Sequence, residues 1–449
     1  MINYSIIQKS QLEGAYRLDA EYYQPEYLTV DKLLLDRSER LSDIAEIRGG
    51  KRLPLGETFS KEGVPYIRVV DMQDFYVDLT NAEKIALDLH ERLNRYQIKK
   101  EEIAVVIVGN TIGLIGFMLS DVTPCNLTEN CAKIITKNVS PYYLAVYLAS
   151  KYGQDQIRRL TVGTAQPKFG IDKLEQLKIF LPNSKFQDII GRYNKDAYMF
   201  FSNAYDLYSQ AEDLLLQELR LKDFKAEEDL SCIVNLSDIK SVHRIDAEYF
   251  QPKYERIIEK IKKYDLKSLG ELVSMKKGFE PGSDEYQDNG KLFLRVSSIS
   301  KNGLIDKDQK YISDELYSKL KNNFEPKKGE ILLTKDATPG VAYVLKESIE
   351  GIIASGIMRL KIKEDIDAEY IALCINSIIC QMQIERDAGG SIISHWKPEQ
   401  IKKLQIPILP KSTQQKIADL VSKSHEARKK AKELLEEAKQ KVEKMILGE

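Results

Sequence analysis

The sequence is poor in the residues that build most metal and disulfide sites. Its 449 residues include five cysteines and four histidines, and no CxxC pair occurs. No histidine lies near a cysteine at the spacing of a zinc site, so we expect no metal and interpret the cysteines as buried free thiols. No run approaches the roughly 18 apolar residues of a membrane span, so no membrane association is expected.

Catalytic signatures are missing as well. No Pro-Pro occurs, and the Asn/Asp-Pro-Pro-aromatic loop of an amino-methyltransferase requires one. GxGxxG, GxxxxGK(S/T), HExxH and GxSxG are absent, and the acidic residues form no clear Asp…Glu-x-Lys nuclease pattern. These absences favour a binding module over an enzyme, and we expect no cofactor to be bound by this chain.

The overall composition is that of a soluble globular protein, with 43% hydrophobic and 30% charged residues. The first ten residues, MINYSIIQKS, lack a basic start, an apolar core and a cleavage site, which predicts a cytoplasmic protein. A formal net charge of -1 counts against a free-standing nucleic-acid-binding domain. It is compatible with a local basic face inside an assembly whose other subunits also hold the nucleic acid.

The chain contains one long internal repeat. Residues 17–27 read RLDAEYYQPEY and residues 244–254 read RIDAEYFQPKY, an offset of 227. This period is far longer than the roughly 20–50 residues of a solenoid unit, so it indicates two copies of a whole domain. A tandem pair can act like a dimer made from one chain, which suits duplex DNA because the duplex has approximate two-fold symmetry.

Both halves show the same order of predicted elements. Strand-like runs are expected at 64–70, 103–108 and 131–136, and again at 292–296, 330–334 and 358–362. Helical patterns are expected at 142–150 and 154–160, and at 368–383. We predict an α+β fold with two tandem pseudo-symmetric modules and two long helices. The predicted segments are 1–185 and 226–411 for the modules, with 186–225 and 412–449 for the helices.

Both long helices carry a heptad pattern that spaces apolar residues alternately by three and four. The predicted partner-helix seam consists of Ile190, Tyr193, Ala197, Phe200, Ala204, Leu207, Ile417, Leu420, Ala431 and Leu434. A helix of about 33 residues is roughly 50 Å long, more than one module would cover. We therefore expect an antiparallel coiled coil; the alternative is that each helix packs only on its own module.

Two pairs of polar loops are candidate DNA readers. The first pair follows a buried strand in each half and is bounded by glycine; its candidates are Asn110, Thr111, Thr334, Lys335 and Thr338. The second pair follows a short arginine-bearing helix; its candidates are Thr164, Gln166, Lys168, Ser391, Ser394, His395 and Lys397. Arg68 and Arg295, which end a repeated strand, complete the candidate DNA contacts.

Each loop also has a structural interpretation. The first pair can be tight turns whose hydroxyl and amide groups cap their own backbone. In the second pair, Phe169 and Trp396 can plug the loop into its own module. The repeated phrase itself is better explained by structure: Arg17, Asp19 and Glu21 can form charge-assisted bonds above packed tyrosines and fasten the start of each module to a neighbouring helix.

The order of these features, given twice, resembles the specificity subunit of type I restriction-modification systems along essentially the full chain. The matching parts are the strand and loop ending in Thr111-Ile-Gly113, the Gly-Thr/Ser loop, and the proline-ended strand before a glutamine-containing helix (Gln187; Gln414-Gln415). One departure is the loop 334–338, which lacks the glycine that usually precedes the hydroxyl residue.

The resemblance implies two target-recognition domains held apart by paired helices, each reading one half of a bipartite, asymmetric DNA site. It implies that the helices dock two methyltransferase subunits, which bring S-adenosylmethionine and modify adenine, and that a restriction or translocase subunit can join. Two other classes remain open from the residues alone. One is a self-contained DNA methyltransferase or nuclease, and the other is a two-domain scaffold that binds proteins only.

Overall fold

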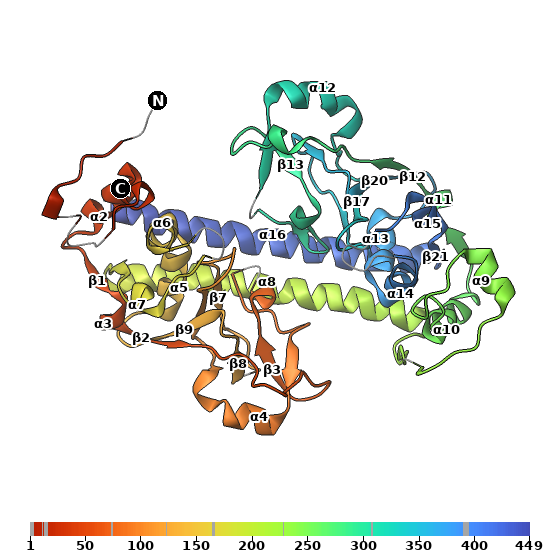
Figure 1. Cartoon of the computed structure of the whole chain (residues 1–449), viewed down its shortest axis with the longest axis horizontal. Coiled ribbons are helices and arrows are strands. Elements are labelled where there is room, and N and C mark those ends of the chain that lie inside the picture. Colours follow the sequence, from red (N-terminus) through yellow and green to blue (C-terminus); the bar gives the residue numbers. More distant parts are fainter. Residues whose placement is uncertain are drawn as a thin grey trace. The chain divides into compact units, whose positions relative to one another are not determined.

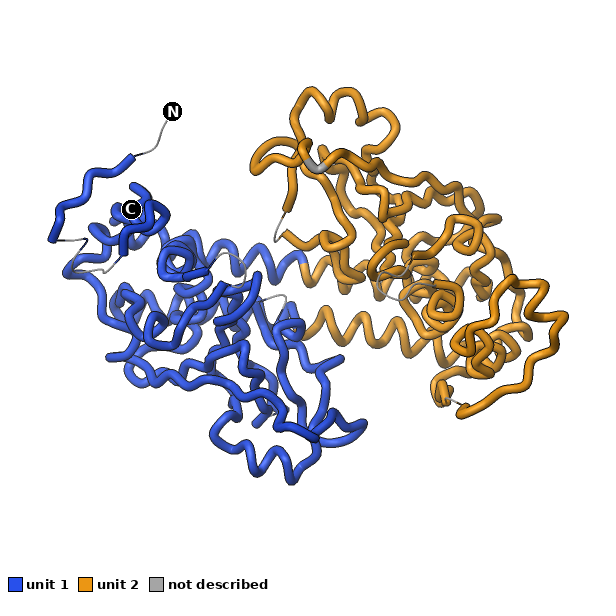
Figure 2. The backbone as a smooth tube through the Cα atoms, in the orientation of Figure 1, with its two compact units in different colours: residues 1–201, 429–449 blue, residues 202–428 orange. Residues whose placement is uncertain are grey.

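Each half of the sequence builds the core of one compact unit. The computed structural model describes residues 4–10, 12, 17–72, 75–122, 124–163, 167–227, 229–306, 309–388 and 395–449. Unit 1 comprises Met1–Phe201 and Lys429–Glu449, and unit 2 comprises Ser202–Arg428 (Figure 2). Both boundaries fall inside a long helix, so each long helix contributes to both units. The four-segment division along the sequence stays a prediction.

Unit 1 is a mixed structure whose main sheet has the strand order β2-β9-β6-β7. A second sheet has the order β4-β3-β8-β5, and β1 pairs with β10. Its strands are β1 Ser38–Arg40, β2 Ala45–Gly49, β3 Val64–Ile67, β4 Glu83–Ile85, β5 Gln97–Ile98, β6 Ile103–Val106, β7 Ile115–Phe117, β8 Cys125–Leu127, β9 Cys131–Thr136 and β10 Lys178–Phe180. Its helices are η1 Ala20–Tyr23, α2 Pro25–Leu34, α3 Leu41–Ile44, η2 Val69–Asp71, α4 Leu87–Arg92, η3 Asn94–Tyr96, α5 Pro141–Ala149, α6 Lys151–Leu160 and α7 Ile171–Leu174.

Unit 2 repeats this arrangement with sheets β12-β20-β17-β18 and β16-β13-β19, and with the pairs β11-β21 and β14-β15. Its strands are β11 Leu266–Ser268, β12 Val273–Lys277, β13 Lys291–Leu294, β14 Ile299–Ser300, β15 Gly303–Leu304, β16 Lys310–Ile312, β17 Ile331–Thr334, β18 Ala342–Val344, β19 Gly351–Ile353, β20 Ile357–Ile362 and β21 Gln405–Pro407. Its helices are α9 Leu236–Val242, α10 Pro252–Ile261, α11 Leu269–Leu272, η4 Ser283–Glu285, η5 Val296–Ser298, α12 Asp314–Phe324, α13 Ala368–Asn376, α14 Ile378–Asp387 and α15 Pro398–Lys403. The α+β prediction is confirmed.

One predicted helix is wrong in detail. The helical pattern at 368–383 forms two helices, α13 and α14, that are separated by Ser377. Ser377 has an extended backbone (φ -85°, ψ 166°), and its buried hydroxyl donates to the carbonyl oxygen of Cys374 at 2.8 Å. A serine that bonds the preceding turn competes with the helical hydrogen bonds and ends the helix there.

The cysteines are free, as expected, and four of the five are buried. Burial raises the pKa of Cys125 and of Cys374 to about 12, so both stay protonated at neutral pH.

The two long helices are α8 Ser184–Glu218 and α16 Lys411–Leu447 (Figure 1). Within unit 1 the first part of α8 lies against the last part of α16, where the Tyr193 hydroxyl donates to Glu437 Oε1 at 2.7 Å. Within unit 2 the later part of α8 lies against the first part of α16, where the Ser424 hydroxyl donates to the carbonyl oxygen of Ala204 at 2.6 Å. The predicted antiparallel pairing is confirmed.

The buried row of the long helices differs by one residue at alternate positions from the predicted seam. It consists of residues 190, 194, 197, 201, 204, 208, 211 and 215 of α8 with residue 219 directly after its end, and of residues 417, 421, 424, 428, 431, 435, 438, 442 and 446 of α16. Every member of the second set lies 227 residues after a member of the first. The internal repeat therefore extends through the packing of both helices.

The predicted seam is correct at Ile190, Ala197, Ala204, Ile417 and Ala431, which are buried. At five positions of the predicted seam the next residue is the more deeply buried one: Tyr193, Phe200, Leu207, Leu420 and Leu434. Phe200, for example, is 37% exposed, whereas Phe201 is buried. Tyr193 nonetheless contacts α16 through Glu437.

Asn194 takes the buried place next to Tyr193, and a search for apolar residues passes over an amide. Its side chain is buried, donates to the carbonyl oxygen of Tyr142 at 3.0 Å, and lies 2.9 Å from the Tyr76 hydroxyl. An amide whose hydrogen bonds are satisfied can occupy a core position at little cost. The buried row also packs into the modules, since Tyr208, Ala211 and Leu215 belong to the core of unit 2.

The repeated phrase fastens the start of each module, as predicted. Arg17 binds Asp19 through two nitrogens, and Arg244 binds Asp246 in the same way. Arg159 of α6 lies 4.2 Å over the Tyr22 ring and donates to the Tyr22 carbonyl oxygen at 2.9 Å. In unit 2, Arg386 of α14 lies 5.5 Å over the Tyr249 ring. The helix to which the phrase was predicted to be fastened is therefore α6 in unit 1 and α14 in unit 2.

The two modules contact the long helices through different chemistry at equivalent positions. In unit 1 the contact is aromatic: Tyr76 packs edge-on against Tyr198 at 5.2 Å, and Phe201 lies 5.0 Å from the same ring. In unit 2 the residues 227 positions after Tyr198 and Phe201 are His425 and Arg428, and both are buried.

The unit 2 contact is an ionic cluster. Buried Glu369 accepts a hydrogen bond from Lys346, and its Oε2 lies 3.8 Å from His425 Nε2. Tyr343 packs edge-on against the His425 ring at 5.4 Å. Aromatic contacts in unit 1 are thus replaced in unit 2 by polar groups whose protonation matters.

Introducing a charge into the buried row should destabilise unit 1. We expect Ala197→Glu to lower the free energy of unfolding by about 3 kcal/mol or more, because the carboxylate would lose its hydration with no partner. Urea unfolding followed by circular dichroism measures the loss. Met199→Glu, at an exposed position of the same helix, is the matched control and should change stability by about 0.5 kcal/mol or less. Equal effects of the two substitutions would contradict the buried row.

Acid should weaken unit 2 through His425. Burial, helped by the charges of Lys346 and Arg428, lowers the pKa of His425 from 6.5 to about 3. Below about pH 6.5 the histidine binds a proton in the unfolded chain but stays neutral in the folded unit. The contribution of His425 to the free energy of unfolding therefore has its full value above pH 6.5 and declines as the pH falls toward 3. At roughly 1.4 kcal/mol per pH unit, the loss by pH 5 is about 2 kcal/mol.

Comparison of the wild-type chain with His425→Gln isolates this effect. Burial raises the pKa of Glu369, and that carboxyl acts in the opposite direction by favouring the folded state in acid. The variant should therefore lose less stability between pH 7 and pH 5 than the wild type, as measured by urea unfolding at both pH values. If the variant and the wild type lost the same stability between pH 7 and pH 5, His425 would not be buried as a neutral ring.

Candidate nucleic-acid interface

The two candidate loops of each module lie side by side. In unit 1, Val108 and Lys168 form an antiparallel bridge, and the Phe169 amide donates to the carbonyl oxygen of Ile107 at 2.8 Å. In unit 2, Asp336 and His395 form the equivalent bridge, and the Trp396 amide donates to the carbonyl oxygen of Lys335 at 2.9 Å. Each pair of loops, predicted separately, is therefore one site.

Aromatic anchors fix the second loop of each pair. Phe169 and Trp396 are each fully buried, as the structural interpretation expected for the aromatic residues. Each anchor is flanked by exposed polar side chains, which are Lys168 in unit 1 and His395 and Lys397 in unit 2. A buried aromatic between exposed polar residues presents those residues from a fixed base.

The exposed residues differ between the modules although the frame is the same. Lys168 occupies the bridge position in unit 1, whereas His395 occupies it in unit 2, with Nδ1 placed 2.9 Å from Asp336 Oδ1. The His395 side chain is 64% exposed. Burial alone would raise the pKa of Asp336, but hydrogen bonds from Lys335 and His395 outweigh it and hold the pKa below the ordinary value. Asp336 is therefore an anion that orients the exposed imidazole.

Two predicted DNA contacts are contradicted by the structure. Thr334 is fully buried; its hydroxyl donates to the carbonyl oxygen of Thr338 at 2.5 Å and accepts from the Val341 amide at 2.9 Å. The Lys335 side chain is 10% exposed, and its amine bonds Asp336 Oδ2. Both residues close the turn, which is the structural interpretation considered for this loop.

The other candidates divide into three groups. Asn110 and Thr338 are exposed and Thr111 is half-buried, and all three lie on the loop after the buried strand, so their contact with DNA stays a prediction. Arg68 and Arg295 are half-buried at the starts of η2 and η5, and Arg68 lies 3.3 Å from Glu83 and 3.6 Å from Asp71. The remaining candidates fall outside the described residues: Thr164, Gln166, Ser391 and Ser394.

Two glutamines that were not among the candidates hold the site together. Gln154 Nε2 donates to the carbonyl oxygens of Gly113 at 2.9 Å and Leu148 at 2.8 Å. Gln381 Nε2 donates to those of Gly340 at 2.9 Å and Ile375 at 2.8 Å. A signal was present in the sequence, because the two glutamines are 227 residues apart. Their contact with the loops depends on the tertiary fold.

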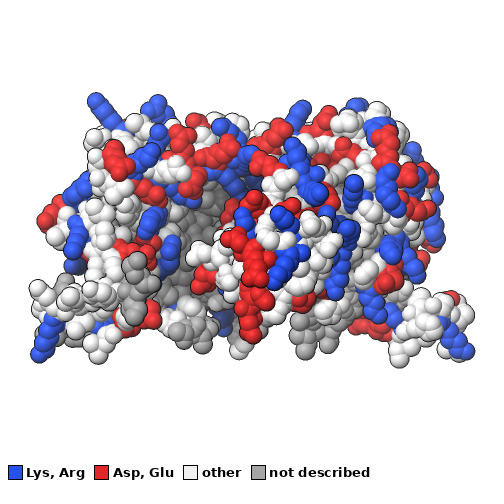
Figure 3. Space-filling model, turned by 90° about the horizontal axis from the view of Figure 1, so that it is seen from above, with Lys and Arg blue, Asp and Glu red and all other residues white. Residues whose placement is uncertain are grey.

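The charged surface fits a protein that does not bind nucleic acid by charge alone. Figure 3 shows lysine and arginine interspersed with aspartate and glutamate over the face in view. This agrees with the formal net charge of -1. The individual basic residues at the loops stay the candidates for phosphate contact.

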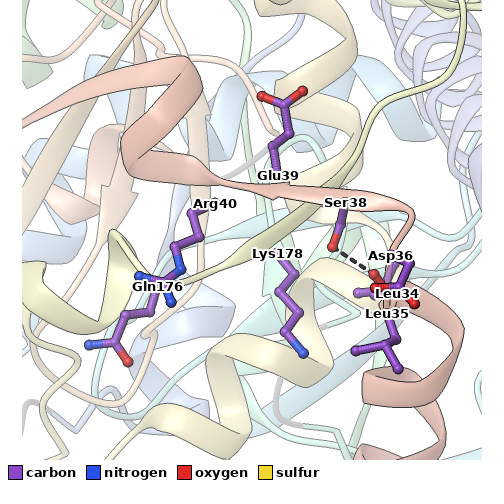
Figure 4. A pocket seen from close by; sticks show the side chains of 8 residues that line it. All are labelled: Leu34, Leu35, Asp36, Ser38, Glu39, Arg40, Gln176 and Lys178. Atoms are coloured by element: carbon purple, nitrogen blue, oxygen red, sulfur yellow. Dashed lines mark hydrogen bonds between the residues drawn. The ribbon is translucent and has the colours of Figure 1, made fainter.

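A shallow pocket in unit 1 lies apart from the loops (Figure 4). It has a volume of about 450 Å³ and is lined by residues of α2, β1 and β10, among them Ser38, Arg40 and Lys178. Lys178 is already paired with Asp31 at 3.0 Å, and the Ser38 hydroxyl donates to the carbonyl oxygen of Leu34 at 2.7 Å. Its polar groups are thus partly committed to the fold.

Two further searches cover the described residues alone. Within them, no group of three or more His, Cys, Asp or Glu side chains is arranged to hold a metal ion. None of the helices in the same part of the chain combines the length and the apolar character needed to cross a membrane.

Two copies of one loop frame, with different exposed side chains, are set on a pair of long helices. The family model of the type I restriction modification DNA specificity domain matches residues 38–197 and 261–440. The chain therefore belongs to this family, and the match falls once in each half of the repeat.

Individual relatives are more distant. The type I restriction enzyme EcoBI specificity subunit of Escherichia coli is 26% identical over 222 residues, which are 48% of this chain and 45% of that protein. The chain thus spans about half the length of this curated relative.

The solved type I S subunit from M. genitalium is 14% identical, with coverage of 91% of this chain and 94% of that one and a TM-score of 0.36. The HsdS subunit from Thermoanaerobacter tengcongensis is 14% identical, with coverage of 91% and 95% and a TM-score of 0.28. The family assignment rests on the family model.

Removing an exposed loop lysine should weaken DNA binding without unfolding the module. We expect Lys168→Ala and Lys397→Ala each to reduce affinity roughly threefold to tenfold and to lower the salt dependence of binding by about one phosphate contact. Fluorescence anisotropy at several salt concentrations measures both quantities. Lys335→Ala should instead lower the melting temperature, because the Lys335 amine is paired with Asp336 inside the loop. The site would be contradicted if Lys335→Ala weakened DNA binding while Lys168→Ala and Lys397→Ala only lowered the melting temperature.

Proposed function

We propose that this chain selects the DNA target of a type I restriction-modification complex. Each module reads one half of a bipartite, asymmetric site, and the two helices set the distance between the halves. The proposed recognition domains are residues 1–185 and 226–411, and the proposed spacer helices are 186–225 and 412–449. The chain acts as the non-catalytic subunit of the complex.

The observation that carries this proposal is one loop frame presenting different side chains in the two modules. A bridge, a buried aromatic and a glutamine-bonded glycine occur in both, but the exposed bridge residue is Lys168 in one and His395 beside Asp336 in the other. Lysine contacts guanine or phosphate, whereas an imidazole oriented by a carboxylate presents different hydrogen-bonding groups. Different half-sites follow, and with them an asymmetric target.

The same repeat supports two equal protein partners. Ile6 and Ile233, which are 227 residues apart, are 88% and 103% exposed, and the equivalent pair Leu18 and Ile245 is also exposed. Apolar side chains left uncovered at the same position of both halves fit two copies of one partner. We assign these partners as methyltransferase subunits that bring S-adenosylmethionine and methylate adenine, with restriction or translocase subunits able to join.

Methylome sequencing tests the proposal in the cell. Deletion of this chain from its host should remove one bipartite adenine mark, because the methyltransferase subunits would lose their target, and re-expression should restore it. A methylome unchanged by deletion would refute the proposal.

Purified components distinguish the alternative classes. The isolated chain incubated with DNA and a radiolabelled methyl donor should transfer no label, and addition of the methyltransferase subunits should start transfer. Label transferred by the chain alone would identify a self-contained methyltransferase. Failure of the complex to retain any duplex selectively would identify a protein-binding scaffold.

A further inference from the structure

We infer that Gln154 and Gln381 are positioning residues that fix the reading loop of each module at its glycine base; the inference rests on the proposed function. Both glutamines lie on the short helix that follows α5 or α13, and both use one amide nitrogen to bind two backbone carbonyl oxygens. One carbonyl belongs to the glycine that ends the loop, and the other belongs to the preceding helix. The glutamine therefore ties the loop to a helix inside the module.

The glycine is held from both sides. The Gly113 amide donates to the carbonyl oxygen of Val106 at 2.9 Å, and the Gly340 amide donates to that of Thr334 at 2.9 Å. With the amide bonded to the buried strand and the carbonyl bonded to the glutamine, only residues 107–112 or 335–339 are left between fixed points. The exposed loop residues Asn110 and Thr338 lie within these short stretches.

Glycine and glutamine fit this role, and few other residue types would. Gly113 and Gly340 have φ values of +86° and +93°, in the left-handed region that favours glycine. A Cβ at Gly113 would lie 2.9 Å from Gln154 Oε1, and one at Gly340 would lie 2.9 Å from Gln381 Nε2. Glycine is thus needed for the side-chain amide to approach. An amide is needed in turn because a carboxylate of the same length has no hydrogen to donate.

A second pair of glutamines provides a matched control. Gln156 and Gln383 lie two residues further along the same helices. In each, Nε2 donates to a backbone carbonyl oxygen and Oε1 accepts from the backbone amide of the same residue, which is Lys178 for Gln156 and Gln405 for Gln383. Lys178 and Gln405 are in β10 and β21, away from the loops. The two pairs therefore share residue type and helix, and they differ in what they hold.

The experiment uses the assembled complex of this chain with its methyltransferase subunits. The probes are a labelled duplex carrying the bipartite site read from the host methylome, and duplexes with single base changes in either half. Gln154→Leu should reduce discrimination about tenfold in the half-site of the first module, the effect of misplacing one base contact, and leave the other half-site unchanged. Gln381→Leu should do the converse.

The controls separate positioning from plain stability. Gln156→Leu and Gln383→Leu should lower the melting temperature while both discrimination ratios remain at the wild-type value. If Gln154→Leu fails to assemble, Gly113→Ala tests the same contact from the loop side and should affect the same half-site. Loss of discrimination in both halves, or in neither, would overturn the inference. Absence of selective binding by the wild-type complex would instead refute the proposed function.

Discussion

The antiparallel packing of α8 against α16 is the constraint on which both modules depend. Each unit contains part of both helices, and the buried residues of the helices also complete the module cores, as Tyr208 and Leu215 do in unit 2. Alanines at 197, 204, 211, 431 and 438 keep the buried row narrow, so the backbones can approach closely. Hydrophobic burial along this row therefore also supports the loops, because the position of a loop depends on the rigidity of the core that carries it.

Much of the fold could be predicted from the sequence, because the same pattern of elements occurs in both halves of the chain. The repeat, the main strands along each half and the two long helices all follow from patterns that recur after 227 residues. The phase of the buried row could not be predicted in full. Asn194 and Arg428 occupy buried positions because the tertiary structure satisfies or packs their polar groups, and no apolar pattern marks such residues.

The site was predictable in location and less so in detail. Loops containing Asn110, Lys168 and His395 were correctly expected to be exposed. Thr334 and Lys335 have the same residue types as the exposed candidates. They are nevertheless buried, because the turn folds back and the Lys335 amine bonds Asp336. That two loops separated by more than 50 residues form one bridge depends on long-range contacts, which residue type and spacing do not encode.

The division of the helices between the units sets the order in which the modules can be completed during synthesis. Residues 202–428 are contiguous, and they include both helix portions that unit 2 requires. Unit 1 begins earlier but lacks its α16 portion, Lys429–Glu449, until all of unit 2 has been made. Domains usually fold in the order of their synthesis. Here the module that is started second is the first that can be completed, and unit 1 stays incomplete until Lys429–Glu449 has been made.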